Sequence, residues 1–147
     1  MNSETIGAVL TNRLALCTVA QGAETDIGLT TYRGKRNISD DLIPCSCVIE
    51  GDVVKESRQG GRSTRYVLKS KFALHAYLPC DGANPNVAGH AAVRDMLRAV
   101  FSDSTLYDSV KDVEFESADI APRADGAAFV LAVIVLSVTS TIDLSKP

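Results

Sequence analysis

Residues 128–142 place the strongest constraint on how this 147-residue chain can fold. The first half of this stretch is apolar at every position, and the second half alternates between apolar and polar residues. A continuous apolar run is typical of a strand that is buried on both faces, whereas alternation indicates burial on one face. Residues 127–136 form the longest apolar run, which is about half as long as a membrane-spanning helix. We therefore expect a long central strand here, and no membrane segment.

The other predicted elements complete an α+β domain. Side chains alternate along residues 66–78, which predicts a half-buried antiparallel strand whose outer face is wet. The remaining predicted elements are a helix over 4–20 with Ser3 as its N-cap, a short extended piece near Tyr32, a strand over 42–49 that 53–55 could extend, a mobile hairpin loop over 56–64, a helix over 86–101, a strand around 113–116 and a turn over 122–126. Residues 1–147 should thus form one domain, with a mainly antiparallel sheet of four or five strands and two helices packed on one face.

Charge is divided unevenly along the chain. Residues 1–72 carry ten Lys/Arg and eight Asp/Glu, whereas residues 73–147 carry five and ten. A net charge of −3 argues against general nucleic-acid binding, which usually needs a strongly basic face. Such an asymmetry is typical of a protein whose charges orient it when it binds its partners. The first four residues have none of the basic and apolar character of a signal peptide, so we expect a protein that is made in the cytoplasm.

A catalytic or metal site is not predicted. The four cysteines (Cys17, Cys45, Cys47 and Cys80) follow no framework spacing and are interpreted as small buried hydrophobic residues. Cys45 and Cys47 would point to the same face of a strand, whereas structural zinc sites use cysteines on turns. Cys80 and His90 are near each other in sequence, but nothing marks an oxyanion hole. An enzyme or ligand-binding domain that uses these two residues remains an alternative; we expect no enzyme, no cofactor and no metal.

Two basic loops are the candidate partner-binding sites. The residues that define them are Arg33, Lys35, Arg36, Arg58, Arg62 and Arg65. Contact with nucleic acid is one interpretation, but the loops have few aromatic residues with which bases could stack. The interpretation we favour is a rim that docks onto an acidic protein surface.

Several short motifs together resemble the tail terminator proteins of long-tailed bacteriophages. The resemblance covers roughly residues 30–147. Its motifs are YRGKR at 32–36, DDLIP at 40–44, EGD at 50–52, His90 with RDMLR at 94–98, VEF at 113–115, DIAPR at 119–123, DG at 125–126 and DL at 143–144.

The resemblance implies an α+β virion protein that acts without a cofactor or catalysis. Proteins of this family assemble as hexameric rings on the head-proximal end of the tail tube. There they stop tube polymerisation and provide the surface that joins the tail to the filled head. The implied partners are further copies of the chain, the tail tube protein and a neck or head-completion protein. DNA would pass through the ring without specific binding, because an acidic second half that lined the channel would repel phosphates. The alternative is another phage neck, head-closure or tail tube protein of similar fold.

Overall fold

The last strand of the chain, β5 (Phe129–Asp143), lies inside a five-stranded sheet, as its apolar sequence predicts. The computed structural model describes residues 2–58, 60, 64–102, 104–122 and 128–145. The strand order is β1-β2-β3-β5-β4. The other elements are the strands β1 (Thr31–Arg33), β2 (Cys45–Arg58), β3 (Arg65–Pro79) and β4 (Asp112–Pro122), and the helices α1 (Ser3–Leu14), α2 (Asn86–Phe101) and α3 (Ser104–Ser109).

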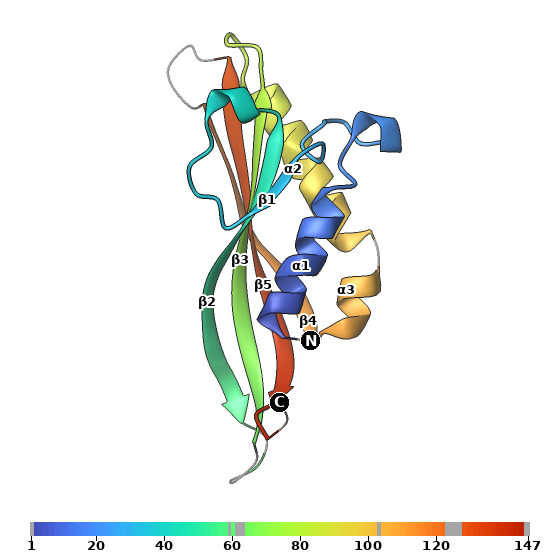
Figure 1. Cartoon of the computed structure of the whole chain (residues 1–147), viewed down its shortest axis with the longest axis vertical. Coiled ribbons are helices and arrows are strands. Elements are labelled where there is room, and N and C mark those ends of the chain that lie inside the picture. Colours follow the sequence, from blue (N-terminus) through green and yellow to red (C-terminus); the bar gives the residue numbers. More distant parts are fainter. Residues whose placement is uncertain (1, 59, 61–63, 103, 123–127, 146–147) are drawn as a thin grey trace.

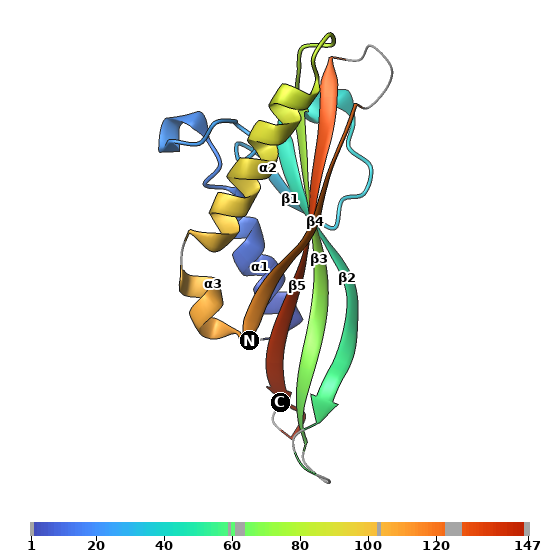
Figure 2. The ribbon, with the colours of Figure 1, turned by 180° about the vertical axis from the view of Figure 1, so that it is seen from behind.

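The sheet is mixed but mostly antiparallel, which confirms the predicted α+β class. The short strand β1 runs parallel to β2, and the other three pairs of neighbouring strands are antiparallel. The helices lie on one face of this twisted sheet (Figures 1 and 2). None of the helices among the described residues is long and apolar enough to cross a membrane.

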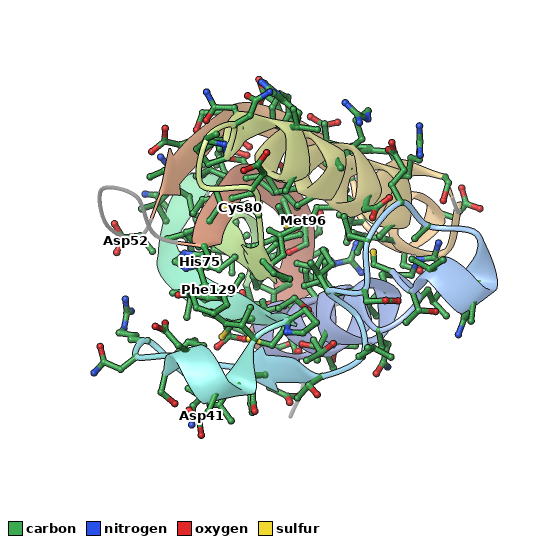
Figure 3. All side chains as sticks on the ribbon, turned by 90° about the horizontal axis from the view of Figure 1, so that it is seen from above. Asp41, Asp52, His75, Cys80, Met96 and Phe129 are labelled. Carbon is green, nitrogen blue, oxygen red and sulfur yellow. The ribbon has the colours of Figure 1, made fainter. Side chains whose placement is uncertain are left out.

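The main core lies between the helices and the sheet. Even-numbered residues of β3 and β5 point toward the helices, because side chains alternate along a strand. Phe72 is the largest fully buried side chain, with 1% of its surface exposed. Met96, labelled in Figure 3, joins the same core from α2. Further members of this core are Ile6, Leu10, Leu14, Leu74, Val100, Ile134 and Leu136.

The opposite face of the sheet, which we call the open face, has no helix over it (Figures 1 and 2). Odd-numbered residues of β5 point to this side, because Leu131 packs in a separate small cluster with Ile38, Cys45 and Tyr77. The segment between β1 and β2 therefore covers one end of the open face. The prediction that the outer face of β3 is exposed to solvent is therefore wrong at this end of the strand, where Tyr77 is buried and His75 is half-buried.

The first helix is shorter than predicted. It ends at Leu14 and not near residue 20, because the chain turns at Ala15 and forms a separate 3-10 turn at Val19–Gln21. The N-cap is Asn2 and not Ser3: the Asn2 side chain accepts a hydrogen bond from the Thr5 main-chain nitrogen at 2.9 Å. Ser3 instead forms a hydrogen bond with Ser70 of β3, so its hydroxyl ties the helix to the sheet.

The strand β2 is longer than predicted. It continues through residues 51 and 52, where a register shift relative to β3 accommodates the Gly-Asp pair. Every residue from 50 to 58 is exposed, so this half of β2 extends past the helices. We call residues 51–58 and 64–68 the arm (lower end in Figure 1). The predicted mobile loop over 56–64 is thus wrong for 56–58, which belong to β2, and residues 59 and 61–63 lie outside the described part.

The second half of the chain follows the prediction closely, with two additions. Helix α2 has the predicted bounds, and the connection from α2 to β4 forms the short helix α3. Strand β4 is longer than the predicted 113–116, because its pairing with β5 continues past a register shift after Phe115. The predicted turn over 122–126 lies mostly outside the described residues; Pro122 itself belongs to β4.

Candidate functional site

Arg33, the first candidate residue, is committed to contacts within the chain. Its guanidinium donates hydrogen bonds to the Glu50 carboxylate and, at 3.0 Å, to the Glu4 main-chain oxygen. These contacts join β1 to β2 and to α1. The hydrogen bond to Glu50 is the main reason that the pKa of Arg33 is raised. Arg33 therefore stabilises the edge of the sheet more than it offers a charge to a partner.

The other basic residues do not form one patch. Lys35 lies over the Tyr32 ring, with its nitrogen 5.2 Å from the ring centroid. Arg58 lies over the Tyr66 ring at 5.6 Å, near the end of the arm. Val48 pairs with Arg33 and lies opposite Leu74 of β3, whereas Arg58 lies opposite Tyr66. The stretch of β3 from Leu74 to Tyr66 spans about 27 Å. The structure thus separates the two predicted basic loops along one margin of the sheet.

The three remaining candidates differ in their surroundings. Arg36 is exposed and close enough to His75 to help lower the pKa of that imidazole, although burial of His75 is the larger cause. Arg65 begins β3 and lies 3.6 Å from the Asp143 carboxylate at the end of β5. Arg62 lies outside the described residues.

A ladder of opposite charges crosses the open face beyond its apolar part. The Lys69 nitrogen lies 3.9 Å from the Glu114 carboxylate, and the Lys71 nitrogen lies 3.6 Å from Glu116. The Glu116 carboxylate also accepts a hydrogen bond from the Ser137 hydroxyl on the intervening strand, and this bond is the main cause of its lowered pKa. Both carboxylates are thus ion-paired residues on the surface of the sheet.

A hollow of about 550 Å³ lies between the start of α2, the end of β3 and the segment 19–26. Its lining is mainly apolar, and Cys80 (labelled in Figure 3) contributes to it. Three carboxylates, those of Glu24, Asp26 and Asp81, also line it. The sequence-based prediction did not include this hollow, because its walls come from segments that are far apart along the chain.

Asp95 holds one wall of this hollow in place. Only 2% of Asp95 is exposed, and its carboxylate accepts hydrogen bonds from the main-chain nitrogens of Glu24 (3.0 Å) and Thr25 (2.8 Å) and from the Thr25 hydroxyl (2.5 Å). The Glu24 carboxylate also forms ion pairs with Arg94 and Arg98 of α2. The sequence signal that could have identified Asp95 is an acidic residue directly beside the apolar residues of a predicted helix.

Cys80 and His90 lie in the walls of two different hollows. Cys80 lines the 550 Å³ hollow, whereas His90 lines a separate hollow of about 250 Å³ between α2 and β4. The two side chains thus border different cavities. Burial is the main cause of the raised pKa of the Cys80 thiol, which disfavours the reactive thiolate.

The other three cysteines are buried, in agreement with the prediction. Burial and, to a lesser extent, Asp95 raise the pKa of Cys17 to about 11. Cys45 and Cys47 both pair with odd-numbered residues of β3, so they share the open face, as expected. Among the residues that the structure describes, no group of three or more His, Cys, Asp or Glu side chains could hold a metal ion.

Comparison with known proteins adds no relationship. No protein-family model matches the chain, and no curated protein sequence matches it.

Proposed function

We propose that this chain is a structural subunit of a long-tailed bacteriophage virion. It assembles as a hexameric ring on the head-proximal end of the tail tube, where it ends tube polymerisation and provides the surface for joining the head. Its partners are other copies of itself, the tail tube protein and a neck or head-completion protein. It has no catalytic role and no cofactor.

The observation that supports an assembly role best is the apolar part of the open face over which no helix lies. The helices cover one side of the sheet only. Val133 and Val135 nevertheless point to the other side, where they are half-buried and the described part of the chain places no helix. An apolar surface of this kind on a small domain is typical of a protein that packs against other chains. The motifs that resemble tail terminators are the reason for proposing that this assembly is a phage tail.

The separation of charge also suits such a role. The arm carries Arg58 and Arg65, whereas the acidic strand β4 is the last strand on the opposite margin of the sheet from β2. A ring of identical subunits would repeat this arrangement around its axis, so one rim would present basic arms to a neighbouring ring. A tail tube subunit would use the same surfaces, but it would polymerise into long tubes, whereas a terminator stops at one ring.

Deletion of the gene from the phage that carries it tests the proposed function. We expect tails that are longer than normal and are not attached to heads, because nothing would end polymerisation or join the filled head. Electron microscopy of the lysate measures tail length and attachment, and supplying the wild-type gene from a plasmid is the control. Normal tails on empty or leaking heads would instead indicate a neck protein, and an absence of tails would indicate a tube subunit.

Reversal of charge on the arm tests which rim meets the partner. A chain in which Arg58, Arg62 and Arg65 are all replaced by Glu should fold but should fail to restore joined tails in the deletion phage. Exposed charges contribute little to stability, so the thermal midpoint should change by no more than a few degrees. The matched control replaces the same three residues by Lys, which keeps the charge and should restore assembly. Normal joining by the Glu variant would show that the arm does not contact the partner.

A further inference from the structure

The hollow of about 550 Å³ beside α2 combines an apolar lining with exposed apolar side chains. Val19, from the segment after α1, and Val87 of α2 both line it and are 56% and 63% exposed. Leu78 and Pro79 at the end of β3 form another part of its wall. The volume lies within the range of cavities that hold a ligand. Large apolar side chains that border such a hollow and remain exposed favour contact with a partner.

The hollow has a negative lining. Nearly all of its lining residues come from the segments 19–26 and 78–91, which together carry three acidic residues and no Lys or Arg. Glu24 forms ion pairs with two arginines of α2, so its charge is largely balanced. Asp26 and Asp81 instead accept hydrogen bonds from main-chain N–H groups, at 2.9 and 3.0 Å. These bonds orient the two carboxylates and leave their negative charge at the hollow, where it would attract a cationic group.

The wall of the hollow is held in place by the fold itself. The buried Asp95 carboxylate accepts its hydrogen bonds from Glu24 and Thr25, and the Cys17 thiol donates to the Asp95 main-chain oxygen at 3.6 Å. Burial of a carboxylate is costly unless hydrogen bonds compensate for lost hydration. Here the compensating donors belong to the segment that forms the wall. A site that is formed before its partner arrives loses less conformational entropy on binding.

The hollow lies at the opposite end of the molecule from the arm. Strand β3 connects the two: Leu68 belongs to the arm, Leu78 lines the hollow, and the stretch between them spans about 33 Å. The arm is at the lower end of Figure 1, and the end of β3 and the start of α2 are at the upper end, onto which Figure 3 looks down. A ring that presents its arms at one rim therefore presents its hollows toward the other rim. The occupant of the hollow then comes from beyond that rim and not from an arm of the same ring.

We propose that the hollow binds a segment of the neck or head-completion protein in which an apolar side chain is flanked by Lys or Arg. The apolar side chain fills the hollow, and the cationic groups lie beside Asp26 and Asp81. The tail tube meets the arms at the opposite rim. The inference rests on the proposed function, for which it specifies the surface that joins the head.

Two variants, tested in the deletion phage, measure the contribution of the hollow to joining. Asp26→Asn/Asp81→Asn removes two charges but keeps an acceptor oxygen for each main-chain N–H. Val87→Lys replaces an apolar contact by a charge that repels a cationic segment. We expect tails of normal length, because the rim that faces the tube is unchanged, but joining to filled heads that is at least about tenfold slower. Electron microscopy measures tail length, and mixing isolated tails with filled heads measures the rate of joining.

Each variant has a matched control outside the hollow. Asp108→Asn/Asp112→Asn removes the same charge from two exposed positions on α3 and β4. Leu144→Lys places a lysine at an apolar position that, like Val87, is 63% exposed. Both controls should join heads at the wild-type rate. Circular dichroism and thermal unfolding establish that every variant is folded.

A photoreactive side chain at position 87 identifies the occupant. With p-benzoylphenylalanine in place of Val87, irradiation of joined virions should cross-link this chain to the neck or head-completion protein. Mass spectrometry should place the cross-link in a peptide that has an apolar residue beside Lys or Arg. The same photoreactive residue in place of Asp108 is the control and should not give this product.

Three outcomes would overturn the proposed contact. The first is joining at the wild-type rate by either folded variant. The second is overlong tails in both variants, which would show that the hollow faces the tube. The third is a virion in which position 87 cross-links to the tube protein, to another copy of this chain or to nothing. Overlong, unattached tails in the deletion phage, together with any of these outcomes, would leave the proposed function standing and reject the hollow as the site of joining.

Discussion

An Asp95→Ala variant is expected to unfold with a free energy about 3 kcal/mol lower than that of the wild type. The substitution removes the acceptor for three hydrogen bonds and leaves the main-chain N–H groups of Glu24 and Thr25 without it. Thr25 N–H is buried, so water cannot replace the carboxylate there without rearrangement. For a domain of this size, the loss corresponds to a fall of roughly 10 °C in the thermal midpoint.

The variant should also loosen one wall of the 550 Å³ hollow. Hydrogen exchange of the Glu24 and Thr25 amides should become faster in Asp95→Ala, because Asp95 is the acceptor for both. Denaturant unfolding and exchange measured by mass spectrometry together check the prediction. The control is Asp108→Ala, since Asp108 is exposed on α3 and its removal should cost less than about 0.5 kcal/mol. Equal stability of the two variants would contradict the role assigned to Asp95.

Gly28→Ala is expected to destabilise the chain by about 2 to 3 kcal/mol. A Cβ atom at this position would lie 2.4 Å from the Leu14 oxygen, 2.8 Å from the Cys17 nitrogen and 2.9 Å from the Ala15 oxygen. All three are main-chain atoms, so no side-chain rotation can relieve the overlap. The turn after α1 would have to move, and with it the hydrogen bond from Gly28 N–H to the Cys17 oxygen.

Gly22→Ala is the matched control for this prediction. Gly22 has a φ of 94°, but no heavy atom lies within 4 Å of the position of an added Cβ. Its replacement should therefore cost only the backbone strain, about 1 kcal/mol. Denaturant unfolding of the two variants separates overlap from strain. A Gly28→Ala variant no less stable than Gly22→Ala would mean that the turn after α1 tolerates displacement.

The elements whose sequence carries a regular period were predicted well. Strands β3 and β5 and helix α2 have nearly the expected bounds, because their apolar residues repeat at the spacing of a strand or a helix. The end of α1 was not predicted, since the apolar spacing continues to Cys17 while close packing of Gly28 against the Leu14 carbonyl turns the chain there. The extent of β2 was also missed, because a Gly-Asp pair is typical of a turn and its pairing with β3 is a long-range interaction.

For the candidate site, too, the sequence predicted some features and missed others. Residue types alone identified the basic positions, but they could not indicate that Arg33 binds Glu50 within the chain or that about 27 Å along the sheet separates it from Arg58. The hollow held by Asp95 was absent from the sequence-based prediction, since its walls come from α2, β3 and the segment after α1.

The sequence by itself determined that residues 128–142 form a long strand in a sheet, and that the chain is an α+β domain, because period and burial are local properties of a segment. Only the tertiary structure decided which side of that strand is covered. The helices take one face, and the apolar residues Val133 and Val135 on the other face of β5 have no helix over them. It also decided which residues of β2 and β4 lie in the same rows of the sheet, since cross-strand register joins residues as far apart in the chain as Arg65 and Asp143.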